Sequence, residues 1–251
     1  MALSNRQKYV RLILACLICW LAAASIQKSM LISGQSKARN VGAKSAELNQ
    51  IAQRQREKIR SLEKTYASTN SSNDAHALID EQMKLAETLW QNQQFAAAQD
   101  GLERSLAVLE KIHGGDAPQL VPVLLSLSRV KQDRIDYQGA KKIVERVMAI
   151  DSRHAGSDNM LLARDLNNLA TLEMLMGMAD KDAVSRYDHL SKAIALLDRS
   201  QEAVRKSQGA KAAVGYAIYL ENRALALREM GFAYDGAQME TEARTAWSKL
   251  R

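Results

Sequence analysis

A helical segment recurs three times along this chain at a nearly fixed interval. Ala98, Ala140 and Ala193 open the copies, so the first spacing is about 42 residues and the second about 53 residues, which places an insertion of about 11 residues in the third copy. A glycine follows each copy at the same offset: Gly114, Gly156 and Gly209. A period of this length indicates a solenoid of stacked helix pairs. Because solenoids use their extended surface for binding, the repeat predicts a binding protein rather than an enzyme.

The composition agrees with an all-α fold. The 251 residues include two prolines, and 47% of them are hydrophobic, with alanine, leucine and the long polar helix formers dominating. Small residues recur at one place in each expected helix pair, where they would let the two helix axes approach closely. The pairs are Ala86 with Ala98, Ser128 with Ala140, and Ala170 with Ala193, and a looser fourth pair offers Ala224 with Ala237. The sequence therefore predicts about four helix pairs over residues 75–251.

The net charge of +7 lies in the N-terminal part of the chain. Residues 1–46 contain seven basic residues and no acidic residue, so residues 47–251 carry 28 bases and 28 acids. A protein that binds nucleic acid carries its excess positive charge on the folded surface. The distribution therefore argues against a nucleic-acid partner and favours a membrane surface.

The N-terminal segment is hydrophobic. Residues 12–26 contain no charged side chain, and three basic residues precede them. One interpretation is a cleaved signal peptide, with Ala22 to Ala24 as the cleavage site. The other is a single-pass anchor, in which residues 9–28 span the bilayer with the help of snorkelling basic side chains. The expected location is a membrane in the second case, and a secreted or periplasmic one in the first.

Three regions are expected along the chain: an anchor or signal peptide at 1–28, a connecting region at 29–74, and a repeat domain at 75–251. The connecting region begins with a basic tether and continues with a charged helix over residues 47–66, expected to be a solvated spacer, with a short coiled coil as the alternative. The Ser/Asn-rich run at 67–74 predicts a linker. Both cysteines, Cys16 and Cys19, lie in the hydrophobic segment, so we expect no disulfide framework.

The junctions between repeats carry a second pattern. Glu110-Lys111-x-x-Gly114-x-Asp116-x-Pro118 precedes the second pair, and Asp116 is placed to cap its first helix. One unit later Gly156 and Asp158 lead, in the same register, into Leu166-Asn167-Asn168-Leu169-Ala170. These residues resemble the tetratricopeptide repeat in its 42-residue variety, typified by kinesin light chain. The resemblance implies a right-handed all-helical solenoid that binds peptides or partner proteins in a concave groove, without catalysis.

The resemblance also implies that the first helix of each pair lines the groove. On a helical wheel, Leu166, Leu169 and Ala170 fall on the packed side of the third repeat. The polar residues on the opposite side form the predicted partner-binding set, taken with their equivalents in the other repeats. The set is Lys84, Glu87, Arg129, Arg164, Asn167, Asn168, Thr171 and Asn222. Asparagine suits an extended peptide because its amide both donates and accepts hydrogen bonds.

Catalytic and metal sites are not expected. The four histidines lack a metal-ligand spacing, and the chain has no phosphate-binding glycine loop and no nucleophile motif. We therefore expect no cofactor, no metal and no small-molecule substrate. The sequence predicts a membrane-tethered or exported adaptor that binds another protein. The alternative is a structural subunit of a membrane assembly that oligomerises through the ends of its solenoid.

Overall fold

The computed structural model describes residues 42–154 and 158–250, and within these residues the secondary structure is entirely helical, without a β-strand. The chain divides into two compact units, residues 1–54 and residues 55–251. In the first unit, residues 42–54 are helical. The predicted membrane segment at 9–28 lies outside the described residues. The helices that concern function all belong to the second unit.

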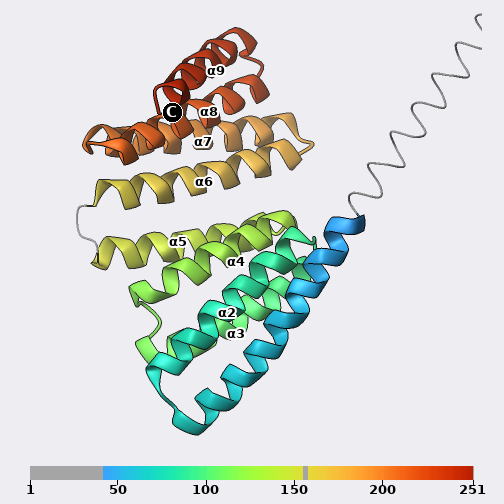
Figure 1. Cartoon of the computed structure of the whole chain (residues 1–251). Helices are drawn as coiled ribbons and strands as arrows, with labels where there is room; N and C mark the ends of the chain where they lie inside the picture. Colours follow the sequence, from blue (N-terminus) through green and yellow to red (C-terminus); the bar gives the residue numbers. More distant parts are fainter. Residues whose placement is uncertain (1–41, 155–157, 251) are drawn as a thin grey trace, which may run out of the picture. The chain divides into compact units, whose positions relative to one another are not determined.

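Four helix pairs follow one another in the second unit (Figure 1). The pairs are α2 (Ser72–Gln91) with α3 (Phe95–His113), α4 (Val121–Asp133) with α5 (Tyr137–His154), α6 (Asn159–Ala179) with α7 (Ala183–Arg205), and α8 (Ala210–Glu229) with α9 (Ala233–Ser248). A short 3₁₀ helix, η1 (Pro118–Leu120), leads into α4. Each helix packs against its partner, and the second helix of one pair packs against the first helix of the next. This arrangement confirms the predicted all-helical fold of about four helix pairs.

Small residues bring the helices of each pair together, as the sequence predicts. Ala98, Ala140 and Ala193 are completely buried. Opposite Ala140, Ser128 is also buried, and its hydroxyl donates a hydrogen bond of 3.3 Å to the Ala140 carbonyl oxygen. A hydrogen bond from a short side chain to the backbone of the partner helix can form only where no larger side chain separates the two helices. The regular interval between the small positions therefore marks the helix contact itself.

The fourth pair corrects the sequence-based interpretation by one position. Ala237 is exposed, and Gly236 takes the buried place, at the same interval after Ala224 that separates Ser128 from Ala140. A Cβ atom at position 236 would lie 3.0 Å from the Ala224 carbonyl oxygen and 2.5 Å from Cγ of Arg228. Glycine is therefore the residue that lets α9 approach α8. The prediction missed it because alanine and glycine stand side by side in the sequence.

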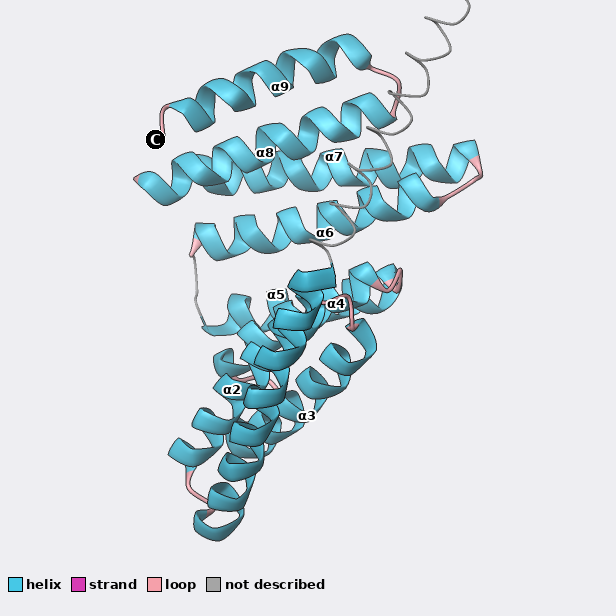
Figure 2. Cartoon of the chain, turned by 45° about the vertical axis from the view of Figure 1, so that its right-hand side comes forward, coloured by secondary structure: helices cyan, strands magenta, loops and turns pink. Residues whose placement is uncertain are grey.

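The insertion in the third copy lengthens both helices of the third pair. Helix α6 continues for nine residues after Ala170, whereas α2 continues for five after Ala86. Helix α7 has ten residues before Ala193, whereas α3 has three before Ala98. The turn between α6 and α7 runs only from Asp180 to Asp182. The extra residues therefore extend the α6–α7 hairpin rather than forming a loop. Figure 2 shows this turn reaching beyond the α8–α9 turn next to it.

The connecting region is more ordered than the sequence indicates. Only Asn70 and Ser71 separate α2 from the preceding helix, which includes residues 55–69 of the second unit. Asn70 adopts a left-handed conformation with φ of 48°, which asparagine tolerates better than most residues. The Ser71 side chain then caps α2 by accepting a hydrogen bond from the Asn73 amide. The Ser/Asn-rich run is thus mainly a helix end and a helix start.

The expectation of a solvated spacer helix is wrong for residues 55–69. Ile59 is buried, and Lys58 makes an ion pair of 2.8 Å with the buried Glu81 of α2. This ion pair lowers the pKa of Glu81, although burial opposes the change. The helix therefore covers the first repeat. The helix packs against the repeats but is not part of a helix pair. The boundary of the repeat domain at residue 75 therefore stays a prediction.

The two equivalent aspartates at the repeat junctions play different roles. Asp158 caps α6 by accepting from the amides of Met160 and Leu161, as its place in the repeat indicates. Asp116 does not cap α4, because η1 intervenes and the first turn of α4 has no side-chain cap. The Asp116 carboxylate instead makes an ion pair with Arg153 of α5. The prediction for Asp116 is wrong because the two prolines tighten the entry to α4 into a 3₁₀ turn.

Candidate partner-binding site

The predicted binding residues lie on the first helix of each pair, and most of them contact one another. In α2 and α4, the carboxylate of Glu87 makes an ion pair with Arg129, which occupies the same position one repeat later. The Arg129 guanidinium also lies 4.1 Å from the centre of the Trp90 ring, a cation–π contact. The Trp90 indole N–H in turn donates to Asp133. At this junction, therefore, the polar groups of the predicted site are already satisfied by the protein itself.

Lys84 stands apart from the other predicted residues. Its side chain is exposed, and its closest charged partner is Glu81 on the same helix, at 3.5 Å. Glu81 is also bound by Lys58. The structure does not bring Lys84 together with the other predicted residues of this set.

The asparagines of the third and fourth pairs meet across two helices. The side-chain amide of Asn222 on α8 donates a hydrogen bond of 2.8 Å to Oδ1 of Asn167 on α6. The hydroxyl of Thr171 donates to the Asn167 backbone carbonyl oxygen at 3.0 Å. Asn168 is half-buried, and its side chain makes no hydrogen bond within the described part of the chain. Of the predicted asparagines, Asn168 is thus the one whose whole side-chain amide remains open to a partner.

Arg164 is held by two carboxylates at the junction between α5 and α6. Its guanidinium binds Asp151 at the end of α5 and also donates to Oδ1 of Asp165, at 2.8 and 2.9 Å. Asp165 is completely buried, and its Oδ2 atom has no hydrogen-bond partner among the described residues. Burial raises the pKa of Asp165 to about 6, although Arg164 acts in the opposite direction. The guanidinium of Arg164 therefore faces the buried carboxylate of Asp165 as well as the Asp151 carboxylate at the end of α5.

A groove opens beside Arg164, between the first halves of α6 and α8. Its volume is about 580 Å³, and the end of α7 forms its third wall. We call it the α6–α8 groove. Three of the predicted residues, Arg164, Asn167 and Asn168, line it. The remaining walls are mainly apolar: Met160, Leu161, Ala163, Val204, Ala210, Val214, Gly215 and Ile218, with Asp158, Ser200 and Lys211. An apolar groove with a few polar groups at its edge has the chemistry of a ligand- or peptide-binding site.

The apolar wall of this groove and Lys211 were not predicted from the sequence. The helical wheel selected polar residues that face away from the core, whereas the wall combines apolar residues of three helices. Its lining includes small residues that let the three helices approach: a Cβ at Gly215 would lie 3.1 Å from Val204 and 3.4 Å from Met160. No pattern within one helix carries this information, since it arises from the packing of α6, α7 and α8 together.

The described residues contain no group of three or more histidine, cysteine, aspartate or glutamate side chains that could hold a metal ion. The structure does bring together two histidines that lie far apart in the sequence. The Nε2 atoms of His76 and His113 lie 3.1 Å apart, and Nδ1 of His76 donates to the Ser72 carbonyl oxygen at 2.6 Å. Within the described ranges no helix is long and apolar enough to cross a membrane.

Comparison with known proteins identifies the repeat. Residues 77–153 match the model of the tetratricopeptide repeat family. The solved structures that resemble this fold include the nearly identical TPR-like repeats of a putative kinesin light chain of Podosopora anserina, at 18% identity and a TM-score of 0.56. That alignment covers 84% of this chain and 97% of that one. A single-residue variant of the same protein aligns with a TM-score of 0.57 at 19% identity, over 84% and 95% of the two chains. No curated protein sequence matches the chain.

Proposed function

We propose that this chain, with its tetratricopeptide repeats, is an adaptor that binds a peptide or partner protein in the α6–α8 groove. The observation that carries the proposal is the groove itself: a mainly apolar depression of about 580 Å³ with the amide of Asn168 on its wall. Helical repeat surfaces of this kind bind other proteins rather than perform chemistry. The proposal accordingly assigns no catalytic step and no cofactor to the chain.

The two kinds of groove surface have complementary tasks. Burial of an apolar side chain of the partner against Leu161, Val204 and Val214 would supply most of the affinity. The Asn168 amide would fix the orientation, because it can donate to a backbone carbonyl and accept from a backbone N–H of the partner. Asn167 contributes less, since its Oδ1 atom already accepts from Asn222.

The proposal includes attachment to, or export across, a membrane through residues 9–28. The support comes from the sequence: an uncharged stretch at 12–26, with Arg11 before it and Lys28 after it. Mass spectrometry of the mature protein tests this part. An intact N-terminus in a membrane fraction supports an anchor, and a chain that begins at Ser25 supports export after cleavage. An intact chain that is recovered without membranes contradicts both.

The binding test compares Asn168→Ala with the parent chain. Proteins that co-purify with the full-length chain are identified first, and the affinity of the tightest is then measured for both forms. Loss of one or two hydrogen bonds should weaken binding by about 1–2 kcal/mol, or roughly ten-fold. The stability of the fold should hold or rise by a few tenths of a kcal/mol, because alanine is the better helix former.

Asn73→Ala serves as the matched control, because Asn73 is an exposed asparagine in the first turn of α2. It should leave the affinity unchanged. If Asn168→Ala binds the partner as tightly as the parent does, the Asn168 amide is a solvated helix face and the groove proposal fails.

A further inference from the structure

The extended α6–α7 hairpin presents an apolar surface at its end. We call residues 178–188 the hairpin tip. Val184 is 79% exposed and Tyr187 is 55% exposed, and Met178 is exposed as well. Of the ten exposed large hydrophobic side chains among the described residues, six lie at turns within helix pairs: Ile135, Met178, Val184, Tyr187, Phe232 and Tyr234. Apolar exposure is thus concentrated on these turns, and half of these six side chains belong to the tip.

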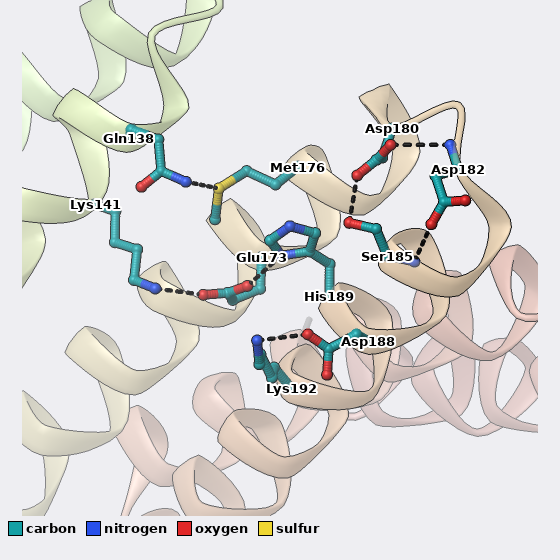
Figure 3. Close-up of polar contacts among 10 residues, drawn as sticks. All are labelled: Gln138, Lys141, Glu173, Met176, Asp180, Asp182, Ser185, Asp188, His189 and Lys192. Atoms are coloured by element: carbon teal, nitrogen blue, oxygen red, sulfur yellow. Dashed lines mark hydrogen bonds and ion pairs between the residues drawn. The ribbon is translucent and has the colours of Figure 1, made fainter.

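The hairpin tip is held rigidly by polar contacts (Figure 3). The Asp182 carboxylate caps α7 by accepting from the Ser185 amide at 2.8 Å. The Asp180 carboxylate accepts from the Ser185 hydroxyl at 2.5 Å and from the Asp182 amide at 3.0 Å. These hydrogen bonds lower the pKa of Asp180, so its carboxylate stays charged at neutral pH. A surface that is ordered before it meets a partner loses less conformational entropy on binding.

A buried ionic contact fixes the hairpin below the tip. Glu173 of α6 is almost completely buried, and its carboxylate binds Lys141 of α5 at 2.6 Å and His189 of α7 at 2.7 Å. These two partners lower the pKa of Glu173 against the effect of burial. Gly177 adds to the contact, because a Cβ there would lie 3.2 Å from the Arg186 carbonyl oxygen. On the other side, Arg186 of the tip makes an ion pair of 2.7 Å with Glu229 of α8, so the tip is a firm projection joined to helices on both sides.

The tip and the α6–α8 groove carry complementary surfaces. The tip has Asp180, Asp182 and Asp188 against Lys181 and Arg186, a net charge of −1. The charged side chains that line the groove are Arg164, Lys211 and Asp158. Beside it, residues 203–220 hold three bases, Arg205, Lys206 and Lys211, and no acid. In the part of the chain that the structure describes, none of these three bases forms an ion pair. The first turn of α8 also lacks a side-chain cap, which favours a carboxylate nearby.

The groove cannot receive the tip of its own chain. The groove residues of α6 end at Asn168 and the tip begins at Met178, near the end of the same helix, so about 15 Å of helix separates them. The occupant must come from another molecule. We propose that the hairpin tip of one copy docks into the α6–α8 groove of a second copy, with Val184 and Tyr187 against the apolar wall and Asp182 near Lys211.

This inference rests on the proposed function, because it names one partner for the same groove. The contact is head-to-tail: each copy offers a tip at one end of α6 and a groove at the other. Successive copies can therefore add to a dimer, and the mass should rise beyond the dimer with concentration. An isologous dimer through one shared surface would stop at two.

The test uses the full chain in detergent and measures mass against concentration by sedimentation velocity. The tip variant carries Val184→Asp and Tyr187→Ser, and the groove variant carries Ala210→Trp and Lys211→Glu. All four positions are exposed, so circular dichroism should show unchanged helix content. Ile135→Ser is the matched control, since Ile135 is a similarly exposed apolar residue at another turn.

The parent chain and the control should grow beyond a dimer, and each variant alone should stay monomeric, with association weakened at least ten-fold. A mixture of the two variants should give a 1:1 dimer and nothing larger, because only one tip and one groove remain intact. A parent chain that stays monomeric, or variants that associate like the parent, would overturn the inference.

Partner binding separates this inference from the proposed function. The tip variant should bind the co-purified partner normally, whereas the groove variant should lose it. If the parent is monomeric and the groove variant loses the partner, self-docking fails and the adaptor proposal stands. If the groove variant binds the partner normally, the adaptor proposal fails as well.

Discussion

The α2–α4 junction and the α6–α8 junction occupy equivalent places in the repeat, and a polar contact spans each of them, yet the α6–α8 junction also has a groove beside that contact. At α2–α4, Arg129 spans the two helices and binds both Glu87 and Trp90. At α6–α8, Asn222 binds Asn167 across the two helices, Arg164 binds Asp151 and Asp165, and a groove lies beside them. A polar side chain on the first helix of a repeat is therefore available to a partner where no side chain of the neighbouring repeat already binds it.

Buried carboxylates show the same contrast. Glu81 of α2 and Asp165 of α6 are both buried. Lysine side chains lower the pKa of Glu81, whereas burial raises the pKa of Asp165 to about 6. The first repeat therefore keeps its buried charge compensated, and the third repeat keeps one that is only partly compensated.

The largest effect is expected at a buried leucine that the second and third repeats have in common. Leu127 of α4 and Leu169 of α6 are equivalent and buried. Leu127→Asp and Leu169→Asp should each bury an unpaired carboxylate and lower the free energy of unfolding by about 4 kcal/mol or more. Urea unfolding measures both values. A small cost at one of the two sites would show that the two positions are not equivalent, and the comparison between the two junctions would lose its basis.

A smaller effect, dependent on pH, is expected at Asp165. Its folded pKa of about 6 exceeds the ordinary value of 3.8, so the folded state binds more protons than the unfolded state between these values. The free energy of unfolding should therefore rise as the pH falls from 7 to 5, by about 1 kcal/mol from this group. Glu173 acts oppositely, but its lowered pKa confines most of that loss to pH values below its ordinary pKa of 4.5.

Asp165→Asn isolates this contribution, since the amide oxygen can still accept from Arg164. Urea unfolding at pH 7, 6 and 5 should show that the variant lacks the rise seen in the parent. A variant whose stability follows the same pH curve as the parent would mean that Asp165 is not the group responsible, and that its charge is compensated as well as that of Glu81.

The smallest effect is expected at the closed junction. Glu87→Gln removes the ion pair with Arg129, but both side chains are partly exposed to water. The free energy of unfolding should fall by a few tenths of a kcal/mol, and high salt should abolish the difference between variant and parent. Thermal unfolding at low and high NaCl measures this. A loss of more than about 1 kcal/mol would indicate that the α2–α4 face is a structural contact rather than a solvated surface.

The helix pairs were largely predictable from the sequence, because a local rule governs them. Small residues at a fixed interval, such as Ala86 and Ala98, mark where two helices touch, and both are buried in the structure. The local rule failed at Gly236, where alanine and glycine are adjacent and only the distance to α8 distinguishes them. It also missed the packing of residues 55–69, because a charged helix can bury one isoleucine and pair an exposed lysine with a buried glutamate.

The candidate site was less predictable, because it depends on contacts between residues far apart in the sequence. The helical wheel placed Glu87 and Arg129 on an exposed face but could not show that they bind each other across one full repeat. It also gave no sign of the buried Asp165, since a charged residue in a sequence suggests a solvated position. The groove arises from side chains of three helices, which no single periodic pattern records.

The sparse burial of α9 has a consequence for how the groove behaves in time. Only Gly236 and Ala243 are buried in this last helix, and its extensive packing is with α8. Amide protons of α9 should accordingly exchange with solvent by local opening, well before those of α6 and α7. Helix α8 loses its contact with α9 each time α9 opens. Because α8 forms one wall of the groove, that wall should become more mobile at each opening. A molecule that binds the groove would slow this exchange, so that recognition and the folding of the last repeat form one coupled equilibrium.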